Sequence, residues 1–255
     1  MYHIFISDIH YGAFGEETNA EIERDLLSLV DYCEKENAVL HILGDLFDYW
    51  MEYPGTLPGL GQGILQRFSR YHQSAEPTLF ITGNHDNWTR GYFKSMGFDV
   101  EKNYRIKNYG NSTVFLHHGD GLDNSELGLP RPLSHRLLRN KWFVKLYQTL
   151  FPPHVGLGIM KRVSRTHRAN PVISPEKLNR WSRKFLKNRD VDLILSGHDH
   201  LPRLIRFDFG SYINLGNFYQ HRTIVEYTNG TFRLVVWNGD QQSCTPFEDH
   251  STIKL

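Results

Sequence analysis

The sequence predicts an α/β fold in which two β-sheets pack together and helices lie outside them. Short apolar runs alternate with helix-like segments in the first third of the chain, as in strands joined by helical crossovers. The last quarter is a series of strand-like segments separated by turn signals. A long helix-like stretch interrupts the strands. We therefore expect one domain, residues 1–255, with a helical insertion, or cap, at about residues 129–170.

The first part of the chain is expected to form three strands and two helices. Apolar runs predict the strands, and apolar residues at a spacing of three or four predict the helices. In chain order the segments are His3–Ser7 (strand), Glu17–Lys35 (helix), Ala38–Leu43 (strand), Ile64–His72 (helix) and Thr78–Thr82 (strand).

The second part begins with a hairpin, continues with helices and ends in strands. Tyr104–Lys107 and Ser112–His117 are expected to pair across the turn at Gly110. The segment Pro130–Lys187 is predicted to be helical, and Ser174-Pro175 is a typical helix start. The remaining expected strands are Val191–Leu195, Arg203–Phe207, Ser211–Leu215, Thr223–Tyr227 and Thr231–Trp237.

Composition excludes several classes of protein. A net charge of +1 gives no overall field that favours nucleic acid, so nucleic acid is not expected as the main substrate. Cys33 and Cys244 lie far apart without a CxxC spacing, which argues against disulfide and zinc-thiolate scaffolds. The N-terminus lacks the features of a secretory signal, and no apolar stretch is long enough to span a bilayer. We expect a cytoplasmic protein.

Five polar motifs stand at the ends of apolar runs. In an open α/β sheet, ligands bind at the carboxyl ends of the strands, so these motifs are expected to meet. In the first of them, residues i and i+2 of an extended chain would point to one side. The motifs are Asp8–His10, Gly44–Asp48, Gly83–Asp86, His117–Asp120 and Gly197–His200.

The donors in these motifs are carboxylates, an amide and imidazoles, without any thiolate. This set suits Mn, Fe or Zn, and it exceeds what a single ion needs. Each motif alone has an ordinary explanation as a turn, a loop cap or a buried histidine. Five in one chain, all at strand ends, favour a centre for a pair of divalent ions.

The motifs resemble the pattern of the calcineurin-like metallophosphoesterase superfamily: D-x-H, GDxxD, GNH(D/E), a His after an apolar run, and GHxH. The resemblance implies a four-layer α/β/β/α sandwich and two divalent ions, Mn²⁺ first, with Fe or Zn as alternatives. It implies that Asp45 bridges the ions and that His118 rather than His117 is a ligand. The implied sets are Asp8, His10, Asp45 and His200 for one ion, and Asp45, Asn84, His118 and His198 for the other.

A narrower resemblance concerns three stretches: Leu46–Trp50 (LFDYW), His118–Leu122 (HGDGL) and Leu146–Arg168. They look like the UDP-2,3-diacylglucosamine diphosphatase family of lipid A biosynthesis, in which a helical insertion forms the substrate cap. This likeness implies hydrolysis of the nucleotide pyrophosphate to UMP and 2,3-diacylglucosamine 1-phosphate. His85 stands where many members of that family have arginine.

His85 is the expected catalytic residue beside the ions. It would stabilise the charge on the phosphoryl oxygens and protonate the leaving oxygen, with Asp48 or Asp86 orienting the imidazole. Other residues are candidates for contacts with the substrate, and for the three arginines a solvated helix face is the ordinary alternative. These candidates are Asn84, Asp123, Asn124, Ser125, Arg162, Arg165 and Arg168.

Apolar and basic residues are both abundant in the cap. Helix packing explains them simply, whereas a groove for acyl chains and peripheral contact with the inner membrane would explain the mixture. Two alternatives to the lipid-linked sugar nucleotide stay open. One is a phosphoesterase acting on another nucleotide, a phosphodiester or a phosphoprotein, and the other is a metal-binding scaffold without catalysis.

Overall fold

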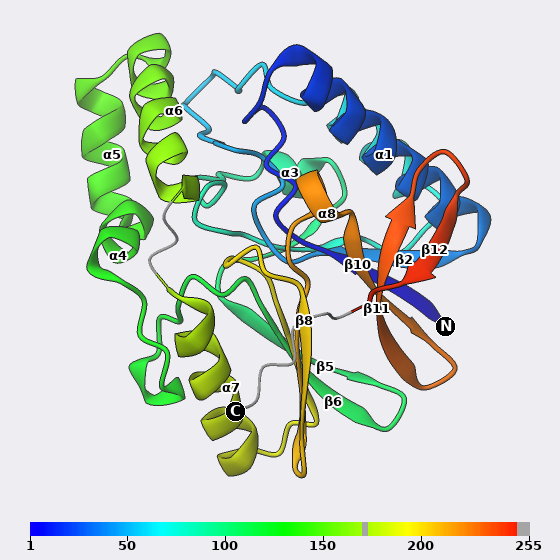
Figure 1. Ribbon diagram of the computed structural model, residues 1–255. Coiled ribbons are helices and arrows are strands. Elements are labelled where there is room, and N and C mark those ends of the chain that lie inside the picture. Colours follow the sequence, from blue (N-terminus) through cyan, green and yellow to red (C-terminus); the bar gives the residue numbers. More distant parts are fainter. Residues whose placement is uncertain (170–172, 249–255) are drawn as a thin grey trace.

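The structure is a computed structural model that describes residues 1–169 and 173–248, without the side chains of residues 166–169. Two sheets lie face to face, and helices cover their outer sides (Figure 1). The helices α4, α5 and α6 stand together at one side of this sandwich (Figure 1). The predicted α/β class is therefore confirmed.

The first sheet has seven strands in the order β12-β11-β10-β1-β2-β3-β4. The four strands from β1 to β4 are parallel, and β10 joins them antiparallel to β1. Their bounds are Tyr2–Ile6 (β1), Ala38–Ile42 (β2), Leu79–Ile81 (β3), Asp99–Glu101 (β4), Thr223–Thr228 (β10), Thr231–Asn238 (β11) and Ser243–Pro246 (β12).

The second sheet has five strands in the order β5-β6-β7-β9-β8. Its centre is parallel, from β6 through β7 to β9, and its two edges are antiparallel hairpin strands. The bounds are Tyr104–Tyr109 (β5), Ser112–His117 (β6), Leu193–Ser196 (β7), Arg203–Phe207 (β8) and Gly210–Asn214 (β9).

Some of the helices begin at a side-chain cap. Ser174 caps the helix that begins at Pro175, because its side chain accepts a hydrogen bond from the backbone N of Lys177. Asn140 caps the helix that begins at Lys141 in the same way. The helices are α1 Glu16–Lys35, α2 Gln62–Tyr71, α3 Tyr92–Ser95, α4 Leu133–Arg139, α5 Lys141–Leu150, α6 Pro153–Ala169, α7 Pro175–Asn188 and α8 Phe218–His221.

Three apolar clusters separate four layers. Side chains alternate across each strand, so Ile4 and Ile6 of β1 pack toward α1 and α2, while Phe5 packs between the sheets. In β6, Val114 faces the same space between the sheets, and Phe115 faces α7. Fully burying one such side chain contributes roughly 1.5–3 kcal/mol. The order of layers is helix, sheet, sheet, helix, as the resemblance implies.

Every predicted strand is present, and its ends differ from the expected ones by at most two residues. The predicted helices are present as well. Five short elements were missed: α3, β4, α8, β12 and a 3₁₀ helix at Ser125–Leu127, each of three or four residues. Segments of that length are too short to show a helical or strand period.

The cap, helices α4 to α6, packs on the core through its own apolar cluster. Met51, Tyr53 and Trp88 of the core contact side chains of the cap that include Tyr147 and Met160. None of the helices in the described part of the chain has the length and apolar character needed to cross a membrane.

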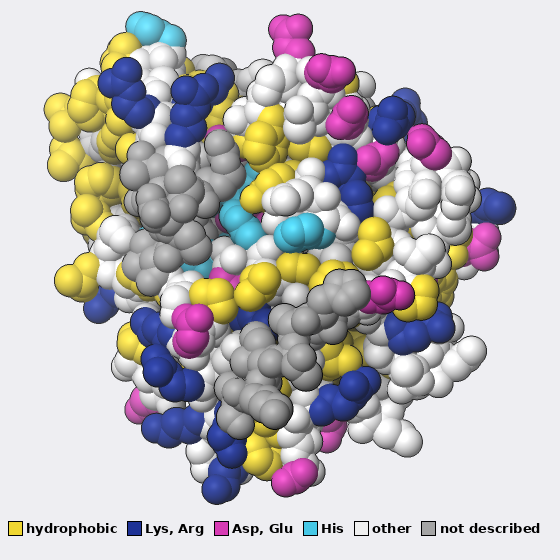
Figure 2. Space-filling model, viewed as in Figure 1, with side chains coloured by type: hydrophobic (Ala, Val, Ile, Leu, Met, Phe, Trp, Pro, Cys, Tyr) yellow, Lys and Arg dark blue, Asp and Glu magenta, His cyan; other side chains and the backbone are white. Residues whose placement is uncertain are grey.

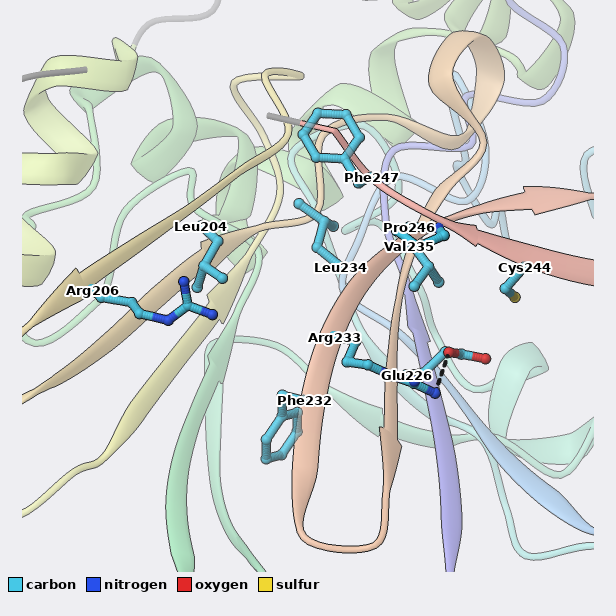
Figure 3. A pocket seen from close by; sticks show the side chains of 10 residues that line it. All are labelled: Leu204, Arg206, Glu226, Phe232, Arg233, Leu234, Val235, Cys244, Pro246 and Phe247. Atoms are coloured by element: carbon cyan, nitrogen blue, oxygen red, sulfur yellow. Dashed lines mark hydrogen bonds and ion pairs between the residues drawn. The ribbon is translucent and has the colours of Figure 1, made fainter. Parts of the chain in front are cut away.

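A cavity of about 460 Å³ opens between the edge strand β8 and the hairpin of β11 and β12 (Figure 3). Leu204, Phe232 and Phe247 supply apolar walls, and Glu226 forms an ion pair at 3.3 Å with Arg233. None of its lining residues belongs to the five polar motifs. This cavity is therefore separate from the candidate metal centre.

Candidate metal centre

The first motif brings Asp8 and His10 to one place, but not in the expected way. The chain is not extended there, because Asp8 and His10 have φ angles of 52° and 47°. Their backbone N–H groups donate to the carbonyl oxygens of Gly44 and Asp45 instead. The loop after β1 is thus folded onto the loop after β2, and this contact positions both side chains.

Left-handed backbone conformations are concentrated in the motifs. Nine non-glycine residues in the described chain have positive φ, and five of them are motif residues. Such conformations cost free energy and persist where the surrounding structure enforces them, often at functional sites. The five are Asp8, His10, Asp45, His198 and His200.

One oxygen of the Asp8 carboxylate is held by hydrogen bonds, and the other faces the histidines of the centre. Oδ2 accepts hydrogen bonds from Ser7 Oγ at 2.6 Å and from the backbone N of His198 at 2.9 Å. Oδ1 is buried and accepts no hydrogen bond from the described residues. It lies 3.3 Å from His200 Nε2 and 3.7 Å from His10 Nε2, so it is oriented to share a cation with both rings.

Asp45 lies in the middle of the centre. Its Oδ1 accepts from the backbone N of His85 at 2.9 Å. Its Oδ2 faces His118 Nε2 at 3.2 Å and His10 Nε2 at 3.6 Å. One carboxylate oxygen therefore points toward histidines from two different motifs, which is the geometry that a bridging ligand needs.

Further potential ligand atoms lie close to one another in the centre. His10 Nε2 lies 3.2 Å from His200 Nε2, and His118 Nε2 lies 3.2 Å from Asn84 Oδ1. Among the described residues, three overlapping triads could hold an ion, because the donor atoms of each lie within 4.8 Å of one another. The triads are Asp8, His10, His200; His10, Asp45, His85; and Asp8, Asp45, His118. This buried set of oxygen and imidazole donors fits divalent cations.

The electrostatics of the centre also fit cations. Burial lowers the pKa of His10 and His118, but Asp48, Asp8 and Asp45 outweigh it and raise these pKa values to about 9 and about 10. Without metal, protons supply the positive charge that the buried carboxylates require. Metal binding therefore has to displace protons from these rings.

His198 completes the cluster from the loop after β7. Its ring centroid lies 5.1 Å from that of His118, and its Nε2 is buried without a hydrogen-bond partner among the described residues. Burial lowers its pKa to about 3, so the ring is neutral at pH 7 and carries a free lone pair. Figure 2 shows histidine side chains in the hollow at the middle of this face.

His117 lies on the other face of β6. Its ring packs against Trp181 of α7 at 4.8 Å between centroids, and burial lowers its pKa to about 3. His118, the next residue, faces the centre. Strand alternation thus places His118 and not His117 among the other motif residues.

His85 is oriented differently from our expectation. Its Nδ1 lies 2.8 Å from the carbonyl oxygen of Asp48 and 2.9 Å from Ser164 Oγ on α6. The Asp48 carboxylate is 4.0 Å from this nitrogen and closer to His10 Nδ1, at 3.6 Å. Both carboxylate oxygens of Asp86 accept instead from backbone N–H groups, Oδ1 from Gly83 and Oδ2 from Leu46. Because a carbonyl only accepts, Nδ1 carries the proton and Nε2 faces Asp45 at 4.0 Å.

The predicted substrate contacts are not gathered at the centre as the metal ligands are. Asp123 accepts from Arg131 Nε at 3.0 Å, and Asn124 caps a short 3₁₀ helix that begins at Ser125. Arg162 and Arg165 are exposed on α6, and the side chain of Arg168 lies outside the described residues. Of the proposed substrate-contacting residues, Asn84 alone is one of the motif residues brought together here.

A buried ion cluster behind the centre was not foreseen. Asp120, two residues after His118, accepts from both Arg131 and Arg139. Arg139 also donates to the carbonyl oxygens of Thr82 and Gly83, at 3.1 and 2.8 Å. Burial raises the pKa of Asp120, but the two arginines outweigh it and hold that pKa well below its usual range. The end of α4 is thereby tied to the loops that carry two motifs.

This cluster and the support of His85 leave little trace in the sequence. Arg131, Arg139 and Ser164 sit in the cap segment, far from any motif, and surface arginines and serines are common. Ser7 is the exception, since it stands directly before Asp8. A polar residue at the end of an otherwise apolar run is a signal that sequence reading can use.

Glycines let the loops of the centre approach closely. A Cβ on Gly83 would lie 2.0 Å from Asp45 Oδ1, and one on Gly44, whose φ is +97°, would lie 2.3 Å from His118 Nδ1. Nothing larger than hydrogen fits at either position without moving a motif side chain.

Gly83→Ala is expected to displace the Asp45 carboxylate, and to destabilise the fold by about 1–3 kcal/mol, the usual cost of overpacking. The variant should also bind divalent metal more weakly, as measured by calorimetric titration with Mn²⁺. Gly15→Ala is the matched control, because a Cβ there meets nothing within 4 Å. Unchanged metal affinity in Gly83→Ala would contradict the assigned role of Asp45.

Comparison with known proteins gives a consistent picture. The family model described as calcineurin-like phosphoesterase matches residues 1–202. The chain is 26% identical over 216 residues to a UDP-2,3-diacylglucosamine hydrolase of Porphyromonas gingivalis, covering 77% of this chain and 82% of that protein. It is 26% identical over 251 residues to the protein of the same name in Coxiella burnetii, covering 93% and 98%.

Likeness among solved structures is weaker. The phosphoesterase Yfce from E. coli aligns over 96% of both chains, with 15% identity and a TM-score of 0.47.

Proposed function

The chain belongs to the calcineurin-like phosphoesterase family and is a metal-dependent phosphohydrolase, and from that premise we propose that its substrate is UDP-2,3-diacylglucosamine. The bond cleaved is the pyrophosphate, which gives UMP and 2,3-diacylglucosamine 1-phosphate. The relatives that carry this name support the proposal, since one of them aligns over 93% of the chain, cap included. The observation that carries the chemistry is the convergence of donors from five loops around Asp45.

We assign two ions to this centre. Asp8, His10 and His200 would hold one ion, and Asn84, His118 and His198 the other, with Asp45 shared between them. The family makes divalent ions the resident cofactor, and the donor set suits Mn²⁺, with Fe and Zn as alternatives. Bound divalent ions supply Lewis acidity for the phosphoryl group and lower the pKa of bound water to about 7.

His85 is the catalytic side chain that the proposal adds to the ligands. With its Nδ1 proton held by the Asp48 carbonyl and Ser164, the neutral ring presents a lone pair at Nε2. Burial lowers the pKa of His85 to about 4, so an approaching phosphoryl anion is needed to favour the imidazolium. In that form Nε2–H can donate to a phosphoryl oxygen or pass its proton to the leaving oxygen.

The outer face of the cap suits a lipid surface. Trp142, Leu146 and Leu150 recur every four residues on α5 and are 78%, 58% and 63% exposed. Lys141 and Lys145 stand beside them, and Figure 2 shows hydrophobic and basic side chains together over α5 and α6. An amphipathic face of this kind binds an anionic membrane surface, where a lipid substrate resides.

Leu146→Asp is expected to reduce binding to vesicles that contain an anionic phospholipid, because a charge then enters the apolar stripe. Cosedimentation measures the bound fraction, and vesicles of a zwitterionic lipid alone should bind less protein. Ile106→Asp is the matched control, since Ile106 is 50% exposed on the edge strand β5, away from the cap. Equal loss of binding in both variants would contradict the role of the cap face.

The inner side of the cap is closed in this structure. The space lined by Asn84, His85, Met160 and Ser164 measures about 20 Å³, which is less than an acyl chain occupies. The apolar cluster around Trp88 and Tyr147 closes a neighbouring part of the interface between cap and core. We therefore propose that acyl chains enter by separating the cap side chains from Trp88, and not through an open tunnel.

Turnover measured on two substrates tests the proposal. We expect metal-loaded protein to hydrolyse UDP-2,3-diacylglucosamine with a far higher kcat/KM than bis-p-nitrophenyl phosphate, which lacks acyl chains and a nucleotide. Equal or better turnover of the small diester would point to a different phosphoester substrate.

A further inference from the structure

A second pocket lies where the cap meets the core. We call it the joint pocket: a cavity of about 280 Å³ lined by Asn87 and Arg90 from the loop after β3, Lys102 after β4, Arg139 at the end of α4, and Lys141 of α5. It adjoins the metal centre, because Asn87 Nδ2 donates to the carbonyl oxygen of Asn84 at 2.9 Å.

Positive charge in the joint pocket is not balanced. Four cationic side chains line it together with a single carboxylate, Glu52. That carboxylate is 3% exposed and already accepts hydrogen bonds from Trp50 Nε1 and from the backbone N of Arg90 and Tyr92. Arg139 is already paired with Asp120, which does not line the pocket, whereas Lys141 forms no ion pair within the described part of the chain. The free charge of the pocket is therefore positive, and its ligand should be an anion.

The cations of the pocket lie close enough together to affect one another. Burial, followed by the neighbouring Arg139 and Lys141, lowers the pKa of Lys102. An anion placed among these groups would relieve their mutual repulsion. Arg90 reaches the same space and donates from Nη2 to Gln148 Oε1 at 2.9 Å, so its guanidinium is held in place.

Two buried polar atoms of the lining have no hydrogen-bond partner among the described residues. One is Oδ1 of Asn87, a residue that is 9% exposed, and the other is Nε of Arg139. A buried acceptor left unpaired is destabilising, and a hydrogen bond donated by a ligand hydroxyl would remove that cost. The pocket thus offers cations for an anionic group and an acceptor for a hydroxyl.

We propose that the joint pocket binds a phosphorylated sugar. Its phosphate would lie against Arg90, Lys102 and Lys141, and one sugar hydroxyl would donate to Asn87 Oδ1. The volume is close to the lower end of the range for small-molecule sites, which suits a ligand of this size. UMP belongs to this class as a product whose phosphate has left the metal centre, and that identification of the ligand rests on the proposed function.

Calorimetric titration of metal-free protein tests the pocket apart from catalysis. UMP and ribose 5-phosphate are expected to bind with similar affinity. Inorganic phosphate should bind about tenfold more weakly, because it leaves Asn87 unpaired, and uridine should give no binding heat. Equal affinity for inorganic phosphate and ribose 5-phosphate would overturn the sugar site, and no binding of either phosphate ester would overturn the pocket.

Charge variants locate the binding. The double variant Arg90→Gln/Lys141→Gln should weaken ribose 5-phosphate binding at least about tenfold, since two charge-assisted contacts are lost. Lys187→Gln, an exposed residue of α7 outside the pocket lining, should bind as the unchanged protein does. Equal affinity of the double variant and the unchanged protein would place the ligand elsewhere.

The outcome is separable from that of the proposed function. If ribose 5-phosphate binds as expected while UDP-2,3-diacylglucosamine is not hydrolysed, the pocket stands and the substrate assignment fails. If that substrate is hydrolysed and the titrations show no binding, the pocket proposal fails alone.

Discussion

Replacing Asp45 by alanine is expected to abolish hydrolysis and the pairing of the two ions. Asp45 Oδ2 faces histidines of two motifs, and its Oδ1 holds the loop that carries His85. Losing a residue that hydrogen-bonds to a metal ligand lowers metal affinity or activity by about 10–100-fold. Losing the shared ligand itself should lower them further. Turnover and metal content, measured by inductively coupled plasma mass spectrometry, check the result.

Two further variants make the result specific. Asp45→Asn keeps the shape of the side chain and removes its charge, so it should also lose the second ion. Asp31→Ala removes a carboxylate that pairs with Arg67 on the surface and should retain both ions and full turnover. A fully active Asp45→Ala protein with two ions would disprove the bridging role.

His85→Ala should keep both ions and lower kcat by about 10²-fold, the lower range for the loss of an acid–base group. The expectation follows from the geometry, since Asp8, Asp45 and the other histidines remain, and only the side chain that faces the phosphoryl group is lost. Measurement of kcat together with metal content distinguishes this outcome from a change in ligation.

The support of His85 offers an internal comparison. Ser164→Ala removes a hydroxyl 2.9 Å from His85 Nδ1, while the Asp48 carbonyl remains as acceptor. It should therefore lower kcat less than His85→Ala does, without altering metal content. If His85→Ala loses an ion, His85 is a ligand, as its place in one of the three triads would allow.

The long elements and the motif residues could both be predicted because each leaves a recognisable pattern in the sequence. A helix such as α1, with Ile22, Leu26 and Leu29 buried on one side, shows its period over many residues. The motifs are recognisable because polar residues break apolar strands abruptly at their ends. Short elements such as β4 and α8 carry no comparable pattern.

The geometry of the loops could not be predicted from the sequence. The prediction that Asp8 and His10 lie side by side was correct, but the extended backbone on which it rested was wrong. Contacts with the loop after β2 impose left-handed conformations on both residues. The orientation of His85 by a carbonyl oxygen depends on where the chain turns after Asp48. Neither feature follows from residue types alone.

Hydrogen bonds between residues far apart in the chain were also not predicted. Arg139 reaches back more than fifty residues along the chain to the carbonyl oxygens of Thr82 and Gly83. Such a contact depends on how the cap docks on the core, and single arginines in a basic segment give no sign of it. The same docking creates the joint pocket.

The most direct test of the account is a crystal structure of the manganese-loaded protein with anomalous scattering recorded for the metal. We predict two manganese peaks, both within ligand distance of the Asp45 carboxylate, with His10 and His200 at one and His118 and His198 at the other. A single peak, or peaks that Asp45 does not contact, would contradict the central claim.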